Sequence, residues 1–205
     1  MTRASFRDDS GQTLPIYIWL TAILLFAALA FFAFAQAASA RNGAQSAADA
    51  AALAAAQAAR DDLLEGLGTA IESGEDGAWL DWLDGVEYPG DDAGPQSAAD
   101  ALAADNDSQL QSLWREQVDG YLGYRVRIRT NYTVGDSIIP GTETQHATAE
   151  ATAVIAPRCD VAPADDPEES VEFSCNGEPF EIDPEDFDMD DLPDASDMFA
   201  VHLAK

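Results

Sequence analysis

The residues with the clearest capacity for chemistry are carboxylates near the end of the printed sequence. Asp186, Asp188 and Asp190 alternate as the first ligands of an EF-hand calcium loop do, and Asp197 stands where the closing glutamate would be. The position that such a loop needs as glycine holds Asp191. These four spaced aspartates are therefore candidate calcium ligands, and the alternative interpretation is a solvated acidic loop.

Histidine and serine give no further catalytic or metal site in the sequence. The only two histidines, His146 and His202, lie far apart, and neither has another histidine or a cysteine at zinc-ligand spacing. The sequence contains no nucleophile-elbow motif and no phosphate-binding G-x-x-x-x-G-K-[ST] loop. We therefore predict that the protein is not an enzyme, takes no cofactor and has no small-molecule substrate.

The two cysteines, Cys159 and Cys175, are predicted to form one disulfide. A bridge that closes so short a loop stabilises a fold by roughly 3 kcal/mol in chain-entropy estimates. Disulfides persist outside the cytoplasm, so this prediction places the C-terminal part in an oxidising compartment. The alternative is a pair of free buried thiols in a cytoplasmic domain.

The charge balance bears on the partners of the protein. The formal net charge is −28, from 38 acidic and 10 basic side chains, and a surface that negative repels the phosphates of nucleic acid. Arg125, Arg127 and Arg129 form the one basic row, on one side of an alternating segment. The row indicates either a contact with an acidic face of a neighbouring subunit or internal pairing with carboxylates such as Glu150. We favour the internal pairing.

A long apolar segment precedes all of these residues. No charged residue occurs between Ser10 and Ala40, and residues 14–35 are almost wholly apolar. A helix of this length spans about 33 Å, which is enough to cross a hydrocarbon core of about 30 Å. Tyr17 and Trp19 near its start are aromatic types that favour the membrane interface. We predict a transmembrane helix over 14–35, with the lipid bilayer as a partner.

The basic residues on either side of this segment predict its orientation. Arg3 and Arg7 precede it and Arg41 follows it, which favours a cytoplasmic leader at 1–13 and an extracytoplasmic C-terminal domain. The protein would then be a single-pass protein of the cell membrane. The alternative is a secretory signal cleaved after Ala38-Ser39-Ala40, which would release a secreted domain. The apolar run is longer than the core of about 7–15 residues that such signals carry.

The residues after the membrane segment are predicted to continue as a helix. Alanine and leucine, the strongest helix formers, dominate Gln36 to Leu67, and we expect the glycines that follow to end the helix: Gly66, Gly68, Gly74 and Gly77. One face of this helix is nearly all alanine, and small side chains let another helix approach closely. Residues 36–68 are therefore either an assembly stalk or a helix that packs on its own domain.

Residues 69–205 are predicted to form an acidic extracytoplasmic head. A partial apolar stripe predicts a second helix over 97–118, and strict alternation predicts a strand over 124–134 with a returning strand over 144–155. Shorter strands are predicted over 171–175, 179–182 and 198–203. The predicted fold class is α+β, with one transmembrane helix extended as a long helix and a small head built on an antiparallel sheet.

The N-terminal third of the chain resembles a known family. The stretch DSGQTLP at 9–15 precedes the apolar run, and the tract AQSAADAAALAAA at 44–56 follows it. This combination, over residues 7–60, resembles the TadE/TadG-like proteins of the Flp (tight-adherence) pilus system, and it is most similar to those of actinobacteria. The resemblance implies a pilin-like fold.

The resemblance also implies a function and a processing site. It indicates a membrane-anchored, pseudopilin-like or minor pilin component of a type IV-like pilus assembly or secretion system, which meets other subunits through its N-terminal helix. In prepilins a peptidase cuts after a glycine before the apolar helix, which here falls between Gly11 and Gln12. The glutamate that prepilins carry five residues into the mature chain is Ile16 here, so retention of the leader as a fixed anchor stays open. The competing function is a stand-alone binding module anchored at the cell surface, with calcium at the acidic tract.

Overall fold

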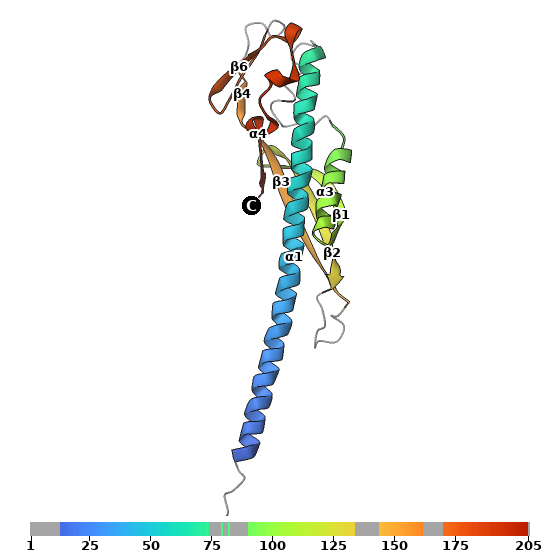
Figure 1. The fold of residues 1–205 in the computed structure, drawn as a ribbon, viewed down its shortest axis with the longest axis vertical. Coiled ribbons are helices and arrows are strands. Elements are labelled where there is room, and N and C mark those ends of the chain that lie inside the picture. The colour runs from blue at the N-terminus through green and yellow to red at the C-terminus, as the bar shows by residue number, and fades with distance from the viewer. Residues whose placement is uncertain are drawn as a thin grey trace, which may run out of the picture.

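A computed structural model describes residues 13–73, 79, 82, 90–133, 144–161 and 170–204. The fold is α+β, with a long N-terminal helix followed by an antiparallel head, as the sequence predicts (Figure 1). The described helices and strands are, in chain order, α1 (Thr13–Ser73), α3 (Ala93–Asp105), β1 (Ser108–Val118), β2 (Tyr121–Thr133), β3 (His146–Pro157), β4 (Cys159–Val161), β5 (Val171–Cys175), β6 (Glu178–Ile182), the 3-10 turns η1 (Pro184–Asp186) and η2 (Met189–Asp191), α4 (Ala195–Met198) and β7 (Phe199–Leu203).

The first helix, α1, is continuous over 61 residues. Its N-terminal half projects away from the rest of the molecule, whereas its C-terminal half runs along the sheet (Figure 1). The predicted membrane segment and the predicted alanine-rich helix are therefore parts of one rod. Its only proline, Pro15, lies in the first turn, where the missing N–H removes no helical hydrogen bond.

The main sheet has four strands in the order β1-β2-β3-β7, and every neighbouring pair is antiparallel. The predicted strands over 124–134 and 144–155 correspond to β2 and β3, and the prediction over 171–175 matches β5. The strand predicted from residue 198 begins one residue later, because Met198 closes the short helix α4. A smaller sheet, in the order β4-β5-β6, stands beside α4 at the far end of the molecule from the projecting helix (Figure 1).

Alanine packs against alanine where α1 crosses the main sheet. From Ala40 onward the buried positions of α1 recur every three to four residues, as one face of a helix requires: Ala44, Ala47, Ala48, Ala51, Ala52, Ala55, Ala56 and Ala59. β3 presents its own alternate alanines to the same core, among them Ala147 and Ala153. The alanine face therefore packs on its own domain, which is one of the two interpretations that the sequence left open.

Two glycines of α1 allow large side chains from the head to pack closely against the helix backbone. A Cβ added at Gly66 would overlap the ring of Trp82, and one added at Gly68 would overlap the sulfur of Met189. The prediction that these two glycines end the helix is wrong, since α1 continues to Ser73. A glycine inside a helix costs about 1 kcal/mol relative to alanine. Here that cost is offset by the close approach of a large side chain. Gly74 and Gly77 lie outside the described residues.

The predicted helix over 97–118 is wrong in its second half. α3 begins earlier, at Ala93, and ends at Asp105, and Ser108–Val118 forms the strand β1. The register shifts between Leu110 and Ser112, where a bulge interrupts the alternation of side chains that would have marked a strand. The turn Asp119-Gly120, with φ of 53° and 88°, joins β1 to β2. Asp-Gly is a turn favoured in two-residue hairpins, and it was the available signal for a strand on either side.

Candidate assembly surfaces

The projecting part of α1 exposes apolar side chains in every direction. Leu14 is 65% exposed and Phe34 is 77% exposed, and the large apolar residues between them are similarly open. None of the most apolar stretch is buried against the rest of the described molecule. Soluble proteins rarely expose contiguous apolar patches larger than a few hundred Å². By length and composition, this is a helix that can cross a membrane.

The only clearly polar side chain within the apolar stretch is satisfied inside the helix. Thr21 Oγ1 donates to the carbonyl oxygen of Tyr17, one turn earlier, over 2.8 Å. Helical backbone groups are likewise paired within the segment, which is the condition that a lipid environment imposes on any spanning element. The Thr21 hydroxyl therefore does not oppose burial of residues 14–35 in lipid.

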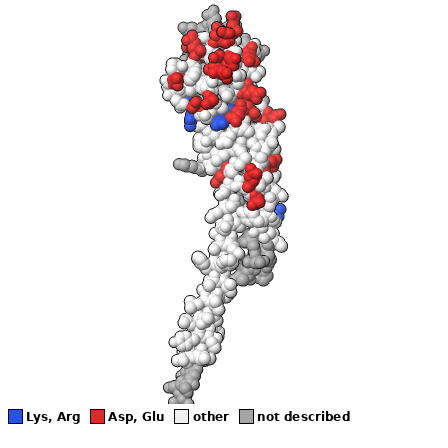
Figure 2. All heavy atoms as spheres, in the orientation of Figure 1, with Lys and Arg blue, Asp and Glu red and all other residues white. Residues whose placement is uncertain are grey.

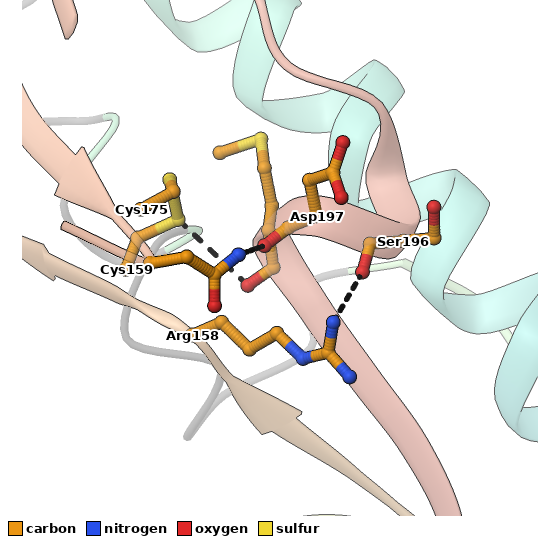
Figure 3. The surroundings of a disulfide bond; sticks show 7 residues. Arg158, Cys159, Cys175, Ser196 and Asp197 are labelled. Carbon is orange, nitrogen blue, oxygen red and sulfur yellow. Dashed lines mark hydrogen bonds between the residues drawn. A yellow bond between two sulfur atoms is a disulfide. The ribbon is translucent and has the colours of Figure 1, made fainter. Parts of the chain in front are cut away.

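A disulfide links two strands of the small sheet, close to the point where this sheet follows the main sheet. Cys159 of β4 and Cys175 of β5 are directly opposite in the strand register and are bonded to each other (Figure 3). Hydrogen bonds tie the neighbouring residues to α4, because the Arg158 guanidinium donates to Ser196 O (3.1 Å) and Asn176 Nδ2 donates to Asp197 O (3.3 Å) (Figure 3). The bridge thus links β4 to β5 within the small sheet, and the two hydrogen bonds hold that sheet against the chain that leads into β7.

The acidic tract folds into short turns in which carboxylates cap backbone amides. Asp188 Oδ1 accepts from the N–H of Asp190 (3.1 Å), and the N–H of Asp188 donates to Asp191 Oδ2 (3.0 Å). Asp186 ends η1, and Asp197 lies in α4. Within the described residues no three His, Cys, Asp or Glu side chains gather into a group that could hold a metal ion. Calcium binding by the four candidate aspartates stays a prediction.

Acidic residues crowd the surface around the small sheet and the turns. Figure 2 shows them concentrated at the end of the molecule opposite the apolar projection, which carries almost no charge in the same view. The molecule therefore has two poles, one apolar and one strongly negative. Carboxylates at that density repel one another and favour contact with water over burial.

The arginine row lies on the face of the main sheet that points away from α1. Arg125 Nη2 donates to Glu150 Oε2 over 2.8 Å, and Arg127 pairs with the other oxygen of the same carboxylate. Glu116 adds a longer contact to Arg125 (3.6 Å), and the Arg125 guanidinium lies 5.7 Å from the ring centre of Trp114. The favoured interpretation, internal pairing, is confirmed for Arg125 and Arg127.

This cluster shifts the pKa values of two of its members, Glu150 and Arg125. Hydrogen bonds from Arg127 and then from Arg125 hold the pKa of Glu150 below its ordinary value. The hydrogen bond to Glu150, together with the charge of Glu116, raises the pKa of Arg125. The cluster lines a recess of about 420 Å³ that also reaches Asp49 of α1 and Leu203 of β7. The arrangement is a charged network that links β1, β2 and β3.

Comparison with known proteins bears on the N-terminal part of the chain. Residues 11–58 match a TadE/G-like family model. Its description is "Putative Flp pilus-assembly TadE/G-like", and this confirms the resemblance that the sequence motifs indicate. No curated protein and no solved structure matches the chain. The shown similarity to this family is therefore confined to residues 11–58, the TadE/G-like segment.

The TadE/G-like segment covers both kinds of surface on α1. It contains the whole apolar stretch and then the alanine face as far as Gln57 and Ala58, next to the buried Ala59. The match thus spans the point near Ala40 at which the helix changes from fully exposed to packed on the sheet. Gly11 and Gln12, the predicted cleavage site, lie outside the described residues.

Proposed function

We propose that the protein is a membrane-anchored, pseudopilin-like subunit of a Flp (Tad) type IV-like pilus assembly or secretion system. The apolar half of α1 holds the chain in the cell membrane, with its leader in the cytoplasm. The acidic head stands outside the cytoplasm. Other subunits of the machine meet the chain through the same apolar helix surface.

The observation that carries this proposal is the division of α1 into two halves. One continuous helix is fully exposed and apolar at its start and forms the core of a folded head from Ala40 to Ile71. A subunit that is stored in a bilayer and then packed against other helices needs a rod of this kind, because the same apolar surface suits both environments. The TadE/G-like segment overlaps that rod over residues 13–58.

The disulfide and the charge distribution support the proposed orientation. A Cys159–Cys175 bridge is stable where the surroundings are oxidising, which favours a head outside the cytoplasm. Arg3 and Arg7 before the apolar stretch and the strongly acidic head after it fit the same direction of insertion.

Deletion of the gene in its bacterial host tests the function. We expect surface pili, or the secreted product of the machine, to be lost and to return when the full chain is supplied in trans. A matched chain with Leu24→Arg and Leu25→Arg keeps every head residue but places two charges in the span, where each costs about 2.5–3.5 kcal/mol. It is expected not to restore assembly. Normal piliation in the deletion strain would contradict the proposal.

A further inference from the structure

The main sheet ends in two outer strands that each have one side without a neighbouring strand. In the described residues β1 pairs only with β2, and β7 pairs only with β3. β1 has 11 residues and β7 has five. Backbone N–H and C=O groups on such a side are available to pair with a strand from another chain.

The hydrogen-bond pattern shows which groups point outward. Two backbone hydrogen bonds join the ends of β7 to β3: Arg158 N donates to Met198 O, and Ala204 N donates to Thr152 O, both over 2.8 Å. The backbone N–H and C=O groups of the even-numbered residues of β7 therefore point toward β3. The backbone groups of Val201 and Leu203 therefore point away from the sheet. In β1, Val118 and Tyr121 flank a two-residue turn, so these two residues form a hydrogen-bonded pair. Because successive residues alternate in direction, the backbone N–H and C=O groups of Gln117 point away from β2.

The number of strands fixes how two copies can meet. Because four strands alternate in direction, β1 and β7 run in opposite directions. When two copies stand side by side in the same orientation, β7 of one and β1 of the next are antiparallel. Antiparallel pairing of β1 with β1, or of β7 with β7, requires the two copies to be related by a two-fold axis. That axis reverses the direction of the strands, and it reverses the direction of α1 as well. Two chains anchored in one bilayer cannot meet in that way.

We propose that β1 of one copy pairs with β7 of the next copy, so that the main sheets of neighbouring heads join edge to edge. The partner is a second copy of this chain, and the inference rests on the proposed function only through the shared orientation in the membrane. Such a contact uses different surfaces on its two sides. It therefore extends into a row or filament unless the rotation between copies closes a ring.

The side chains along the two edges fit this pairing. β7 contains no charged residue, and β1 carries one charge of each sign, Arg115 and Glu116, but neither strand contains lysine or proline, which natural edges often use to block pairing. The bulge near Gln111 leaves Ser112–Val118 as a regular stretch long enough to cover all of β7. The dense acidic surface lies around the small sheet and the turns, so pairing along the main sheet keeps it in water (Figure 2).

Site-directed cross-linking in host membranes tests the pairing. Ser112 and Val118 on β1 share the outer sheet face with His202 on β7. Full-length Ser112→Cys (or Val118→Cys) and His202→Cys chains, each with its own tag, are made together and treated with a short bis-maleimide. We expect a cross-linked dimer that carries both tags. Cells that make either variant alone should give none. His202→Cys made with Glu181→Cys, an exposed strand position on the small sheet, is the matched control and should also give none.

A second variant separates pairing from folding. Gln117→Pro removes an outward N–H that makes no bond to β2, and proline is tolerated at such edge positions. We expect an unchanged melting temperature of the purified protein and loss of the two-tag dimer. Same-tag dimers as strong as the mixed dimer would overturn the proposal, as would no mixed dimer from chains that resist alkaline extraction. The absence of a mixed dimer from such chains would not contradict the proposed membrane anchoring.

Discussion

At the scale of single residues, Glu150 is the centre of the network on the outer face of the main sheet. Its two carboxylate oxygens face different arginines, so one side chain joins two positions of β2 to β3. Thr152 Oγ1 donates to Glu116 Oε1 over 2.8 Å and brings β1 into the same network. The arginine row is thus explained mainly by pairing inside the subunit.

The lowered pKa of Glu150 predicts a pH dependence of stability. A carboxyl whose pKa is lower in the folded state stabilises the fold above its unfolded pKa, and that contribution is lost as the pH falls through the folded value. Glu150→Gln should therefore lower the stability at neutral pH and make the loss of stability below the ordinary pKa of 4.5 shallower. Urea unfolding of the full chain in detergent from pH 7 to pH 3 measures both effects. Glu181→Gln, on an exposed strand position, is the control. A parallel pH profile in Glu150→Gln would contradict the role.

At the scale of elements, the sequence predicted those parts whose pattern is undisturbed. β2 alternates without interruption because one face covers the core and the other faces water, with Tyr124, Val126 and Ile128 buried. β1 was predicted as a helix because its bulge interrupts that alternation and leaves leucines at spacings that also fit a helix. The continuation of α1 past Gly66 depends on contacts with residues distant in the chain, which local propensity cannot reveal.

The contact between Gly66 and Trp82 predicts a coupled pair of substitutions. Gly66→Ala should gain about 1 kcal/mol from helix propensity, but in the native protein the new methyl group overlaps the indole ring. We expect the free energy of unfolding to rise by about that amount only when Trp82→Ala is also present. Denaturant unfolding of the two single variants and the double variant measures the coupling. Equal effects of Gly66→Ala in both backgrounds would show that the ring does not lie on the glycine.

The alanine-to-alanine packing predicts intolerance of larger side chains on α1. Ala52 is fully buried against the sheet, so Ala52→Leu should destabilise the head by about 1–3 kcal/mol through overpacking. Gln57→Leu places the same side chain on the exposed face of the same helix and should change stability by less than about 0.5 kcal/mol. Thermal unfolding of both variants in detergent compares them. Similar losses would mean that α1 does not lie on the sheet as described.

At the scale of the whole molecule, one helix connects two environments. The most apolar stretch of α1 is not buried against the rest of the described molecule, and the second half of the helix supplies the central face of the head's core. The head cannot separate from the rod without exposing that core, so any movement of the apolar half moves the head with it. Near the other pole, hydrogen bonds from Arg158 and Asn176 to α4 connect the disulfide-bridged small sheet to the same body.

The topology of the full chain in its own membrane tests the account most directly. Envelopes are extracted with alkaline carbonate, and intact spheroplasts are treated with a protease that is added from outside. We expect the chain to stay with the lipid in carbonate and the head to be digested without lysis, while a cytoplasmic marker protein survives. Release of the full-length chain into carbonate, or a head that is cut only after lysis, would contradict an anchored subunit with an external head.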